Sequence, residues 1–410
     1  MPDDVRMMGF FEKTDLESGL EALRSCVRPL GEEMVPLREA LGRTLAQDVI
    51  STEIVPAFHK SAMDGFAVRG AETFGATPND PVPFRVVGEI LPGDSGDLDV
   101  KPGEAVRIMT GGAMPTGADA VLMAEYATDR GDVVLANASV VPGRNVARAG
   151  EDIQRGDRVL GRGRLLRPAD LGVLASIRVS KVAVMKRPIV GILSTGNELV
   201  EYDSEDRVRP GQVVNSCGPM LEGMVHQTGG QPRWLGTVPD EREALREALL
   251  SFDGDILLTT GATSTGQEDY LPGLLTELGE LLVHGVNIRP ASPLAFGRLG
   301  HTLAVLLPGN PVAAMVGFDV FVRPALQLQL GQEERRWNRR VRGNLKRKIA
   351  SSLNRTDFVR VTLPEEGTVE PLRSGGAGVL TSVTRADGFV IVGRDEEGLE
   401  AGTEVEVYLY

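Results

Sequence analysis

The stretch IVGILSTGNE, residues 189–198, is an apolar run that ends in a loop of small and polar residues. Two later stretches repeat this pattern, ILLTTGATSTG at 256–266 and LAVLLPGNP at 303–311. Short continuous apolar runs are typical of parallel strands that are buried on both faces of a sheet. We therefore predict an open α/β sheet with its active site in these loops. Backbone N–H groups and helix N-termini converge at the carboxyl edge of such a sheet, so the ligand is predicted to be anionic.

Length and composition restrict the class of protein. A chain of 410 residues is long enough for roughly two to four domains. The net charge of −13, with a single basic run at 335–342, argues against nucleic acid as a partner. The two cysteines fit a reducing cytoplasm, and the four scattered histidines argue against a His/Cys zinc site. No apolar run approaches the ~20 residues of a membrane helix, so no membrane partner is expected.

The spacing of apolar residues and the frequency of turn residues change along the chain. Leucines recur at helical spacing in 15–27 and again in 36–48, which predicts two helices. Pro-Gly and Gly-Asp turns punctuate 52–154 and predict an inserted β-rich domain. A helical pattern at 168–175 then resumes the first domain. The predicted domains are a discontinuous helical and extended domain (1–51 and 155–187), the β-rich insertion (52–154), an α/β domain (188–331) and a small C-terminal β domain (338–410).

The elements of the α/β domain follow from periodicity and capping signals. Asn310 before Pro311 is a typical helix start, and this last helix is predicted to run to about Leu330. The preceding elements are predicted as strands at 189–194, 232–237 and 255–260, a helix at 216–228 closed by Gly229, a helix capped by Asp240, and a helix at 268–278. In the C-terminal domain, alternating residues at 359–361, 389–392 and 405–408 predict strands.

Candidate ligand-binding residues lie in the strand-end loops, and each has a simpler alternative. Gly261, Ser264 and Gly266 suit close backbone approach to a phosphate or another oxyanion, although an ordinary turn has the same composition. Asp269 follows beside Glu268 and suits Mg²⁺, or it compensates a helix dipole. Glu198 faces the same edge or is a solvated loop acid. Asp240 resembles a plain N-cap.

The β-rich domain contributes three further segments, 61–67, 107–112 and 150–152. Each contains a polar residue outside any periodic element, namely Asp64, Thr110 and Asp152. A turn aspartate is the default interpretation for such positions. Sequence patterns alone do not join these residues to the α/β site.

Six segments together closely resemble the molybdopterin molybdenumtransferases, the MoeA and gephyrin E-domain family. They occur in the family's order and span nearly the whole chain. The matching segments are SAMDGFA at 61–67, RIMTG at 107–111, GADAV at 117–121, GEDI at 150–153, STGNEL at 194–199 and LPGNP at 307–311.

The resemblance implies a fold, a reaction and a set of site residues. The fold would be an elongated homodimer of four-domain subunits, with a central three-layer, MogA-like α/β domain that binds molybdopterin. The ligand cleft would combine this domain with the β-rich domain of the other subunit, so that Asp64, Thr110 and Asp152 act in trans. In the implied reaction, adenylylated molybdopterin is hydrolysed with a divalent cation such as Mg²⁺, and molybdate enters the freed dithiolene. The residues carried over are Asp64, Thr110, Asp152 and Glu198 for catalysis, Asp240 and Asp269 for metal, and Gly261, Ser264, Gly266, Arg289, Pro308, Gly309, Asn310 and Arg360 for substrate. The molybdopterin adenylyltransferase and apo-molybdoenzymes are the implied protein partners.

The chain departs from the family pattern at positions that concern oxyanions. Family lysines are replaced by Gly285 and Ser292, and a third is Arg289. The segment 262–263 is Ala-Thr rather than Gly-Val, and 376–378 lacks an expected serine. Two alternatives therefore stay open. One is a paralogue that binds the adenylylated pterin without inserting molybdate, or that handles tungstate. The other is a gephyrin-like scaffold, which is disfavoured because the resemblance begins within the first twenty residues.

Overall fold

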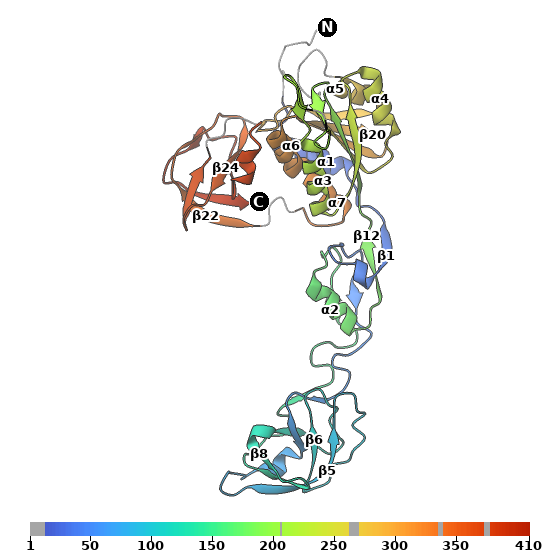
Figure 1. Cartoon of the computed structure of the whole chain (residues 1–410), viewed down its shortest axis with the longest axis vertical. Helices are drawn as coiled ribbons and strands as arrows, with labels where there is room; N and C mark the ends of the chain where they lie inside the picture. The colour runs from blue at the N-terminus through green and yellow to red at the C-terminus, as the bar shows by residue number, and fades with distance from the viewer. Residues whose placement is uncertain (1–12, 206, 262–269, 335–338, 373–377) are drawn as a thin grey trace. The chain divides into compact units, whose positions relative to one another are not determined.

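Figure 1 shows the computed structural model of the chain, which describes residues 13–205, 207–261, 270–334, 339–372 and 378–410. The chain divides into two compact units. One unit comprises residues 34–41 and 47–182, and the other comprises 1–33, 42–46 and 183–410. The division into four domains, with its limits, stays a prediction.

The first predicted helix is present as α1 (Leu16–Cys26). Asp15 caps it, because its carboxylate accepts hydrogen bonds from the backbone N–H groups of Glu17 and Ser18, both at 3.1 Å. Leu20 and Leu23 are fully buried in the core of the α/β domain. The prediction for 15–27 is therefore confirmed, and α1 forms part of the α/β core.

The second predicted helix, at 36–48, is wrong. Only η1 (Leu37–Glu39) is helical, between β1 (Glu32–Pro36) and β2 (Val49–Ile50). Gly42 has a φ of +70°, which interrupts a right-handed helix, and Leu45 pairs with Val184 of β12 (Lys181–Met185). Leu41 is 51% exposed. The helical spacing of these leucines is therefore coincidental, because strand pairing determines the conformation here.

The β-rich segment forms a six-stranded sheet in the order β7-β4-β6-β5-β9-β8. Apolar side chains cover both of its faces: Phe66 and Val68 pack on one side, while Ala67, Ile90 and Val106 pack on the other. Its strands are β4 (Gly65–Val68), β5 (Val82–Ile90), β6 (Glu104–Ile108), β7 (Ala120–Met123), β8 (Ala127–Asp129) and β9 (Val133–Ala136). The smaller elements of this unit are β3 (Lys60–Ser61), η2 (Gly70–Thr73), η3 (Ala124–Tyr126), β10 (Val146–Ala147), β11 (Arg158–Leu160) and α2 (Pro168–Ser176), the last of which was predicted at 168–175.

The three apolar stretches that predicted the fold are neighbouring parallel strands. They are β13 (Ile189–Thr195), β17 (Ile256–Thr260) and β21 (Thr302–Leu307), with β16 (Gln231–Val238) parallel on the outer side of β13. Two antiparallel strands, β20 (Ala295–Leu299) and β18 (Glu280–His284), complete the sheet order β16-β13-β17-β21-β20-β18. The open, mostly parallel sheet is confirmed.

Helices cover both faces of this sheet, as the alternation of its buried residues shows. Ile256 and Leu258 face a core formed with α1, α3 (Cys217–Thr228), α6 (Pro311–Gly317) and α7 (Arg323–Gln329). Leu257 faces the opposite core, formed with α4 (Arg242–Ser251) and α5 (Leu271–Leu278). The domain is therefore the predicted three-layer α/β sandwich (Figure 1).

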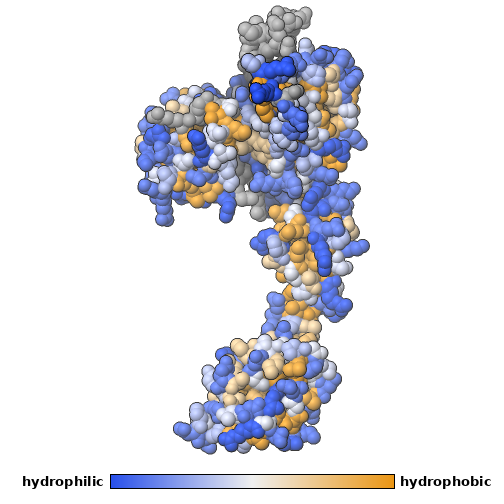
Figure 2. Space-filling model, in the orientation of Figure 1, coloured by the Kyte–Doolittle hydropathy of each residue, from blue (hydrophilic) through white to orange (hydrophobic). Residues whose placement is uncertain are grey.

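The final helix of the domain begins at Pro311 after the N-cap position Asn310, as predicted, and continues through the π-helical turn η4 (Phe318–Val322) into α7. The span Pro311–Gln329 is long and apolar enough to cross a membrane, but 83% of its most apolar window is buried inside the protein. The face of the molecule in Figure 2 has its apolar residues interspersed among hydrophilic ones. This span is the core helix of the α/β domain.

The C-terminal segment forms a second β domain. The strands β22 (Arg340–Leu345), β24 (Thr356–Thr362), β25 (Thr368–Pro371), β26 (Gly388–Val392) and β28 (Glu404–Leu409) are ordered β24-β25-β22-β28-β26, and an additional β24–β26 pairing closes this order into a ring. A short strand of the α/β domain, β19 (Ile288–Arg289), pairs with β24. Arg289 is thereby held beside the C-terminal domain. The remaining elements are β14 (Leu199–Val200), β15 (Val213–Val214), β23 (Ile349–Ala350), α8 (Thr381–Thr384) and β27 (Gly398–Leu399).

Candidate active site

The carboxyl ends of β13, β17 and β21 open onto a cavity of about 490 Å³. This volume is in the usual range of small-molecule sites. We call it the loop cavity. Among the residues that line it are Thr195, Glu198, Asn215, Cys217, Thr260, Gly261, Gly309, Asn310 and Gly378. The structure thus brings together four of the predicted site residues, Glu198, Gly261, Gly309 and Asn310.

Two hydroxyl residues that line the loop cavity, Thr195 and Thr260, form hydrogen bonds with side chains behind its wall. The Thr195 hydroxyl donates to the Asp240 carboxylate, and Ser194 Oγ lies 3.0 Å from Thr260 Oγ1. The prediction that Asp240 caps a helix is wrong, because Glu241 occupies the N-cap position of α4. Asp240 is instead held at the end of β13, since β16 brings it beside Thr195.

Two glycines allow close contacts at the loop cavity, Gly196 with the Glu198 carboxylate and Gly261 with the Thr195 carbonyl. At Gly196, a Cβ would lie 2.8 Å from Glu198 Oε2, so the Glu198 carboxylate folds back over a backbone without a side chain. Gly261 has a φ of +99°, and a Cβ there would lie 2.2 Å from the Thr195 carbonyl oxygen. The glycines therefore keep the ends of β13 and β17 close together.

Replacing Gly261 by alanine is expected to displace this loop. The new Cβ would collide with backbone and would also adopt a strained positive φ, which by itself costs about 1–3 kcal/mol. Gly236 is a matched control, because its φ is +93° but its Cβ would meet nothing within 4 Å. Urea denaturation should show a larger loss of unfolding free energy for Gly261→Ala than for Gly236→Ala. Equal losses would mean that the close approach to Thr195 is unimportant.

The thiol in the loop cavity is not an activated nucleophile. Cys217 is buried, and burial raises its pKa to about 11. Its Sγ lies 3.5 Å from the carbonyl oxygen of Gly309. Because the thiolate is the nucleophilic form of cysteine, Cys217 stays protonated and inert at neutral pH. The other polar side chains that line this cavity include the Glu198 carboxylate and the hydroxyls of Thr195 and Thr260.

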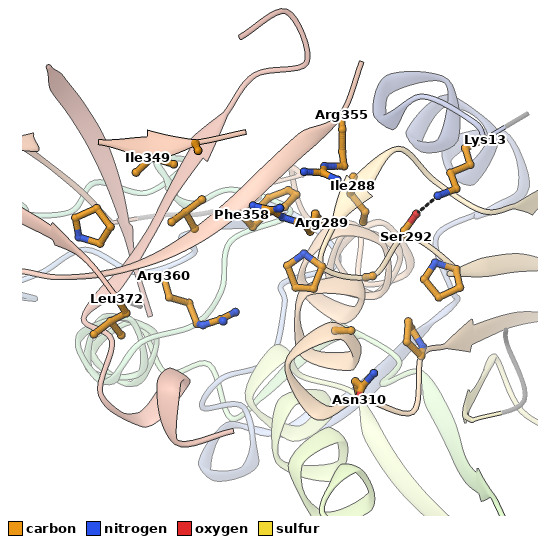
Figure 3. Close-up of a pocket in the computed structure, with 18 of the residues that line it drawn as sticks. Lys13, Ile288, Arg289, Ser292, Asn310, Ile349, Arg355, Phe358, Arg360 and Leu372 are labelled. Atoms are coloured by element: carbon orange, nitrogen blue, oxygen red, sulfur yellow. Dashed lines mark hydrogen bonds between the residues drawn. The ribbon is translucent and has the colours of Figure 1, made fainter. Parts of the chain in front are cut away.

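A second cavity, of about 750 Å³, lies between the α/β domain and the C-terminal β domain. We call it the cationic cavity, because Lys13, Arg289, Lys348, Arg355 and Arg360 line it, and none of its described lining residues is an acid. Pro308 and Asn310 also line it, so Asn310 borders both cavities. Figure 3 shows the side chain of Arg360 extending from β24 into this cavity.

The cations of the cationic cavity differ in how they are neutralised. Asp357 is fully buried and pairs with Arg289 (Nη2 to Oδ2, 2.8 Å) and with Arg355 (Nε to Oδ1, 2.7 Å). Arg360 is only 6% exposed, and within the described part of the chain its Nε has no hydrogen-bond partner. Burial lowers the pKa of Arg360 from its ordinary value. A buried guanidinium with no acid partner among the described residues is costly to desolvate.

Two predicted residues of the other unit form a local pair. The Thr110 hydroxyl and its backbone N–H both donate to Asp64 Oδ1, each at 2.7 Å. These bonds lower the pKa of Asp64, the hydroxyl contributing most, so the carboxylate is ionised at neutral pH. Asp152 lies in a turn of the same unit, and its backbone N–H donates to Val55 at 3.0 Å. The structure therefore brings Asp64 and Thr110 together, while their link to the α/β site stays a prediction.

Some predicted residues lie outside the described residues, namely Ser264, Gly266 and Asp269. In the part of the chain that is described, no group of three His, Cys, Asp or Glu side chains could hold a metal ion. Sequence reasoning missed Lys13, Asn215, Arg355 and Asp357. Of these, only Asn215 had a usable signal, because it precedes a predicted helix; its Oδ1 accepts the Gly218 N–H at 3.1 Å.

Three family models match the chain in succession. They are the "MoeA N-terminal region (domain I and II)" at residues 14–177, the "Probable molybdopterin binding domain" at 191–328 and the "MoeA C-terminal region (domain IV)" at 342–410. Together these matches define a multidomain protein of molybdenum cofactor biosynthesis.

Individual relatives agree with this class. A Methanocaldococcus jannaschii protein named for molybdopterin biosynthesis is 38% identical over 92% of this chain and 91% of its own. The molybdopterin molybdenumtransferase of Bacillus subtilis is 34% identical over 92% of this chain and 89% of its own. A crystal structure of the molybdopterin biosynthesis MoeA protein from Pyrococcus horikoshii is 32% identical, covers 97% of this chain and 100% of its own, and has a TM-score of 0.85. The chain belongs to the MoeA family of molybdopterin molybdenumtransferases.

Proposed function

We propose that this protein inserts molybdate into the dithiolene of adenylylated molybdopterin and releases AMP. The observation that carries the proposal is the pair of adjoining cavities that share Asn310. One offers the Glu198 carboxylate, hydroxyls and the loops of parallel strands, which suit a phosphoanhydride and the water that attacks it. The other offers cations without acids on its lining, which suit an oxyanion.

In this proposal the loop cavity holds the phosphates of the substrate. Gly261, Gly309 and Asn310 provide close backbone approach. Ser264 and Gly266, which lie outside the described residues, are proposed as further phosphate ligands. Glu198 is positioned to orient or deprotonate the attacking water. The hydrolysis adds water across the phosphoanhydride and frees AMP, which leaves the dithiolene available to the metal.

We propose Mg²⁺ as the cofactor of the hydrolysis, held by Asp240 with Asp269. Mg²⁺ is usually bound by one or two carboxylates, several waters and substrate phosphates, so a site with few protein ligands fits it. Asp240 accepts a hydrogen bond from Thr195, which lines the loop cavity. Bound there, the cation would neutralise charge on the phosphates.

The oxyanion is assigned to the cationic cavity, with Arg289 and Arg360 as its main ligands. Arg289 is 53% exposed even though it pairs with Asp357, so its guanidinium remains accessible. Molybdate carries two negative charges, and desolvating it requires cationic donors. Tungstate has the same charge and shape. The replacement of family lysines by Gly285 and Ser292 therefore keeps tungstate, and binding without insertion, as the competing outcomes of the tests.

The remaining parts of the proposal concern assembly. We propose a homodimer in which Asp64, Thr110 and Asp152 complete the site of the other subunit. The ionised, hydrogen-bonded Asp64 supports a role for it in catalysis. The proposed partners are the molybdopterin adenylyltransferase, which would supply the substrate, and apo-molybdoenzymes, which would receive the product in the cytoplasm.

Arg289→Ala is expected to separate the two half-reactions. Loss of a charge-assisted hydrogen bond weakens anion binding about tenfold or more, so the molybdate concentration for half-maximal insertion should rise by that factor. AMP release, followed by chromatography, should remain near the wild-type rate. Arg298→Ala is the matched control, because Arg298 pairs with Glu280 on the surface away from both cavities. If AMP release collapses while the molybdate dependence is unchanged, Arg289 belongs to the phosphate site.

A further inference from the structure

The chain just before α1 runs along the loop that carries the altered family positions. The Thr14 N–H donates to the Gly285 carbonyl at 3.0 Å, and the Asn287 N–H donates to the Thr14 carbonyl at 2.9 Å. The Asn287 side chain also donates to the Lys13 carbonyl at 3.2 Å. Because Asp15 then caps α1, the backbone of Lys13 and Thr14 is held in one place against residues 285–287.

This backbone position directs the Lys13 side chain to the cationic cavity. Its ammonium donates to Ser292 Oγ at 2.6 Å, as the dashed line in Figure 3 shows. Lys13, Ser292 and Arg289 line the same cavity. The two positions where a family lysine is replaced by an uncharged residue, 285 and 292, are therefore both in contact with the Lys13–Thr14 segment.

We propose that Lys13 is an oxyanion-binding residue, which supplies from the N-terminal segment the ammonium group that Gly285 and Ser292 do not. The proposal deepens the proposed function and rests on it, because it assigns a further ligand to the same molybdate site. Ser292 takes part as a relay: its oxygen accepts from Lys13, so its own hydrogen is free to point to an anion oxygen.

The charges of the cavity explain why such a residue is needed. Arg289 and Arg355 share the buried carboxylate of Asp357, which offsets part of their positive charge. Lys348 is an exposed lysine that pairs with Glu400 at 2.5 Å. Arg360 is the buried cation, but an arginine binds through a planar fork, whereas an ammonium is a compact point charge. Lys13 therefore adds a cation of the chemical type that the loop has lost.

The competing explanation is that Lys13 merely tethers the N-terminal segment to Ser292. Lys13→Gln distinguishes the two, because glutamine can still donate a hydrogen bond but has no charge. If Lys13 binds the oxyanion, Lys13→Gln should weaken molybdate and tungstate binding about tenfold and reduce its dependence on salt. If it is a tether, binding should be unchanged.

A second variant restores an ammonium group to the cavity from a different residue, Ser292. Ser292→Lys places an amine at the position that Lys13 now contacts, so the double variant Lys13→Gln/Ser292→Lys should regain most of the lost affinity. Lys346→Gln is the charge-matched control, because Lys346 is exposed and is not among the residues lining the cavity. Thermal unfolding of each variant shows whether a loss of binding reflects a loss of fold.

The measurement is a calorimetric titration of the full-length protein with molybdate and, separately, tungstate, at low and high salt. The proposal expects weak binding by Lys13→Gln, recovery in the double variant and wild-type binding by Lys346→Gln. It is overturned if Lys13→Gln binds as the wild type does, or if the double variant shows no recovery although it is folded. If Arg289→Ala also leaves binding unchanged, the oxyanion is held elsewhere and the proposed function of the cavity fails as well.

Discussion

Arg360→Met is expected to stabilise the protein and to abolish its oxyanion binding. Arg360 is only 6% exposed and its Nε has no hydrogen-bond partner among the described residues, so the ligand-free fold pays for the desolvation of this charge. Because a buried charge without a partner is costly, an apolar side chain of similar length should stabilise the fold by about 1–4 kcal/mol, the range seen when buried ion pairs are replaced. The same change removes the donors to the anion, and affinity should fall about 30-fold or more. Urea denaturation and molybdate titration measure the two effects.

The prediction is specific because Arg360→Met should raise stability while it lowers oxyanion affinity. A residue that only supports the fold would lose stability and activity together. Arg347→Met is the matched control, because Arg347 lies in the same domain, is 43% exposed and pairs with Glu370. It should change neither quantity appreciably. The account of Arg360 is wrong if Arg360→Met destabilises the protein strongly, or if molybdate still binds as in the wild type.

Mixing inactive Asp64→Ala and Glu198→Ala proteins is expected to restore activity. Each variant alone loses a carboxylate of the proposed site. If the site combines Asp64 of one subunit with Glu198 of the other, a hybrid dimer has one intact site and one doubly defective site. Random exchange of equal amounts makes half of the dimers hybrid, so about a quarter of wild-type AMP release should return.

The complementation needs evidence that subunits exchange. Mass spectrometry of differently tagged variants reports the fraction of hybrid dimers in the same sample. The control mixes wild type with an Asp64→Ala/Glu198→Ala double variant. If the site is shared between subunits, each hybrid of this mixture has one substitution in each of its two sites, so its hybrids should be inactive. Hybrids that form in quantity and show no activity would place Asp64 and Glu198 in the same subunit's site or in separate functions.

The strands of the α/β sheet were predictable because burial on both faces leaves a continuous apolar run, as at 256–258 in β17. The helix predicted at 36–48 failed because leucine spacing does not distinguish a helix from a chain that pairs with β12 through Leu45. Asp240 failed as a cap for a related reason. A Pro-Asp pair reads as a helix start, but the partner of this carboxylate is Thr195, which is 45 residues away.

Some residues of the candidate site were predictable from the sequence and others were not. Glu198, Gly261 and Asn310 were predictable because loops after parallel strands meet at one edge. Lys13 was not, because its contact with Ser292 spans 279 residues and depends on where α1 begins. Asp357 was not predictable either, since an acid in an alternating strand gives no sign that it is buried between two arginines.

The central claim is that this chain completes the molybdenum cofactor, and reconstitution of an apo-molybdoenzyme tests it most directly. The purified protein is incubated with adenylylated molybdopterin, Mg²⁺ and molybdate, the apo-enzyme is added, and AMP and recovered enzyme activity are measured together. The account predicts that both appear, that omitting molybdate leaves AMP release without recovered activity, and that tungstate does not replace molybdate in restoring activity. AMP release without any activation at saturating molybdate, or activation by tungstate alone, would contradict it.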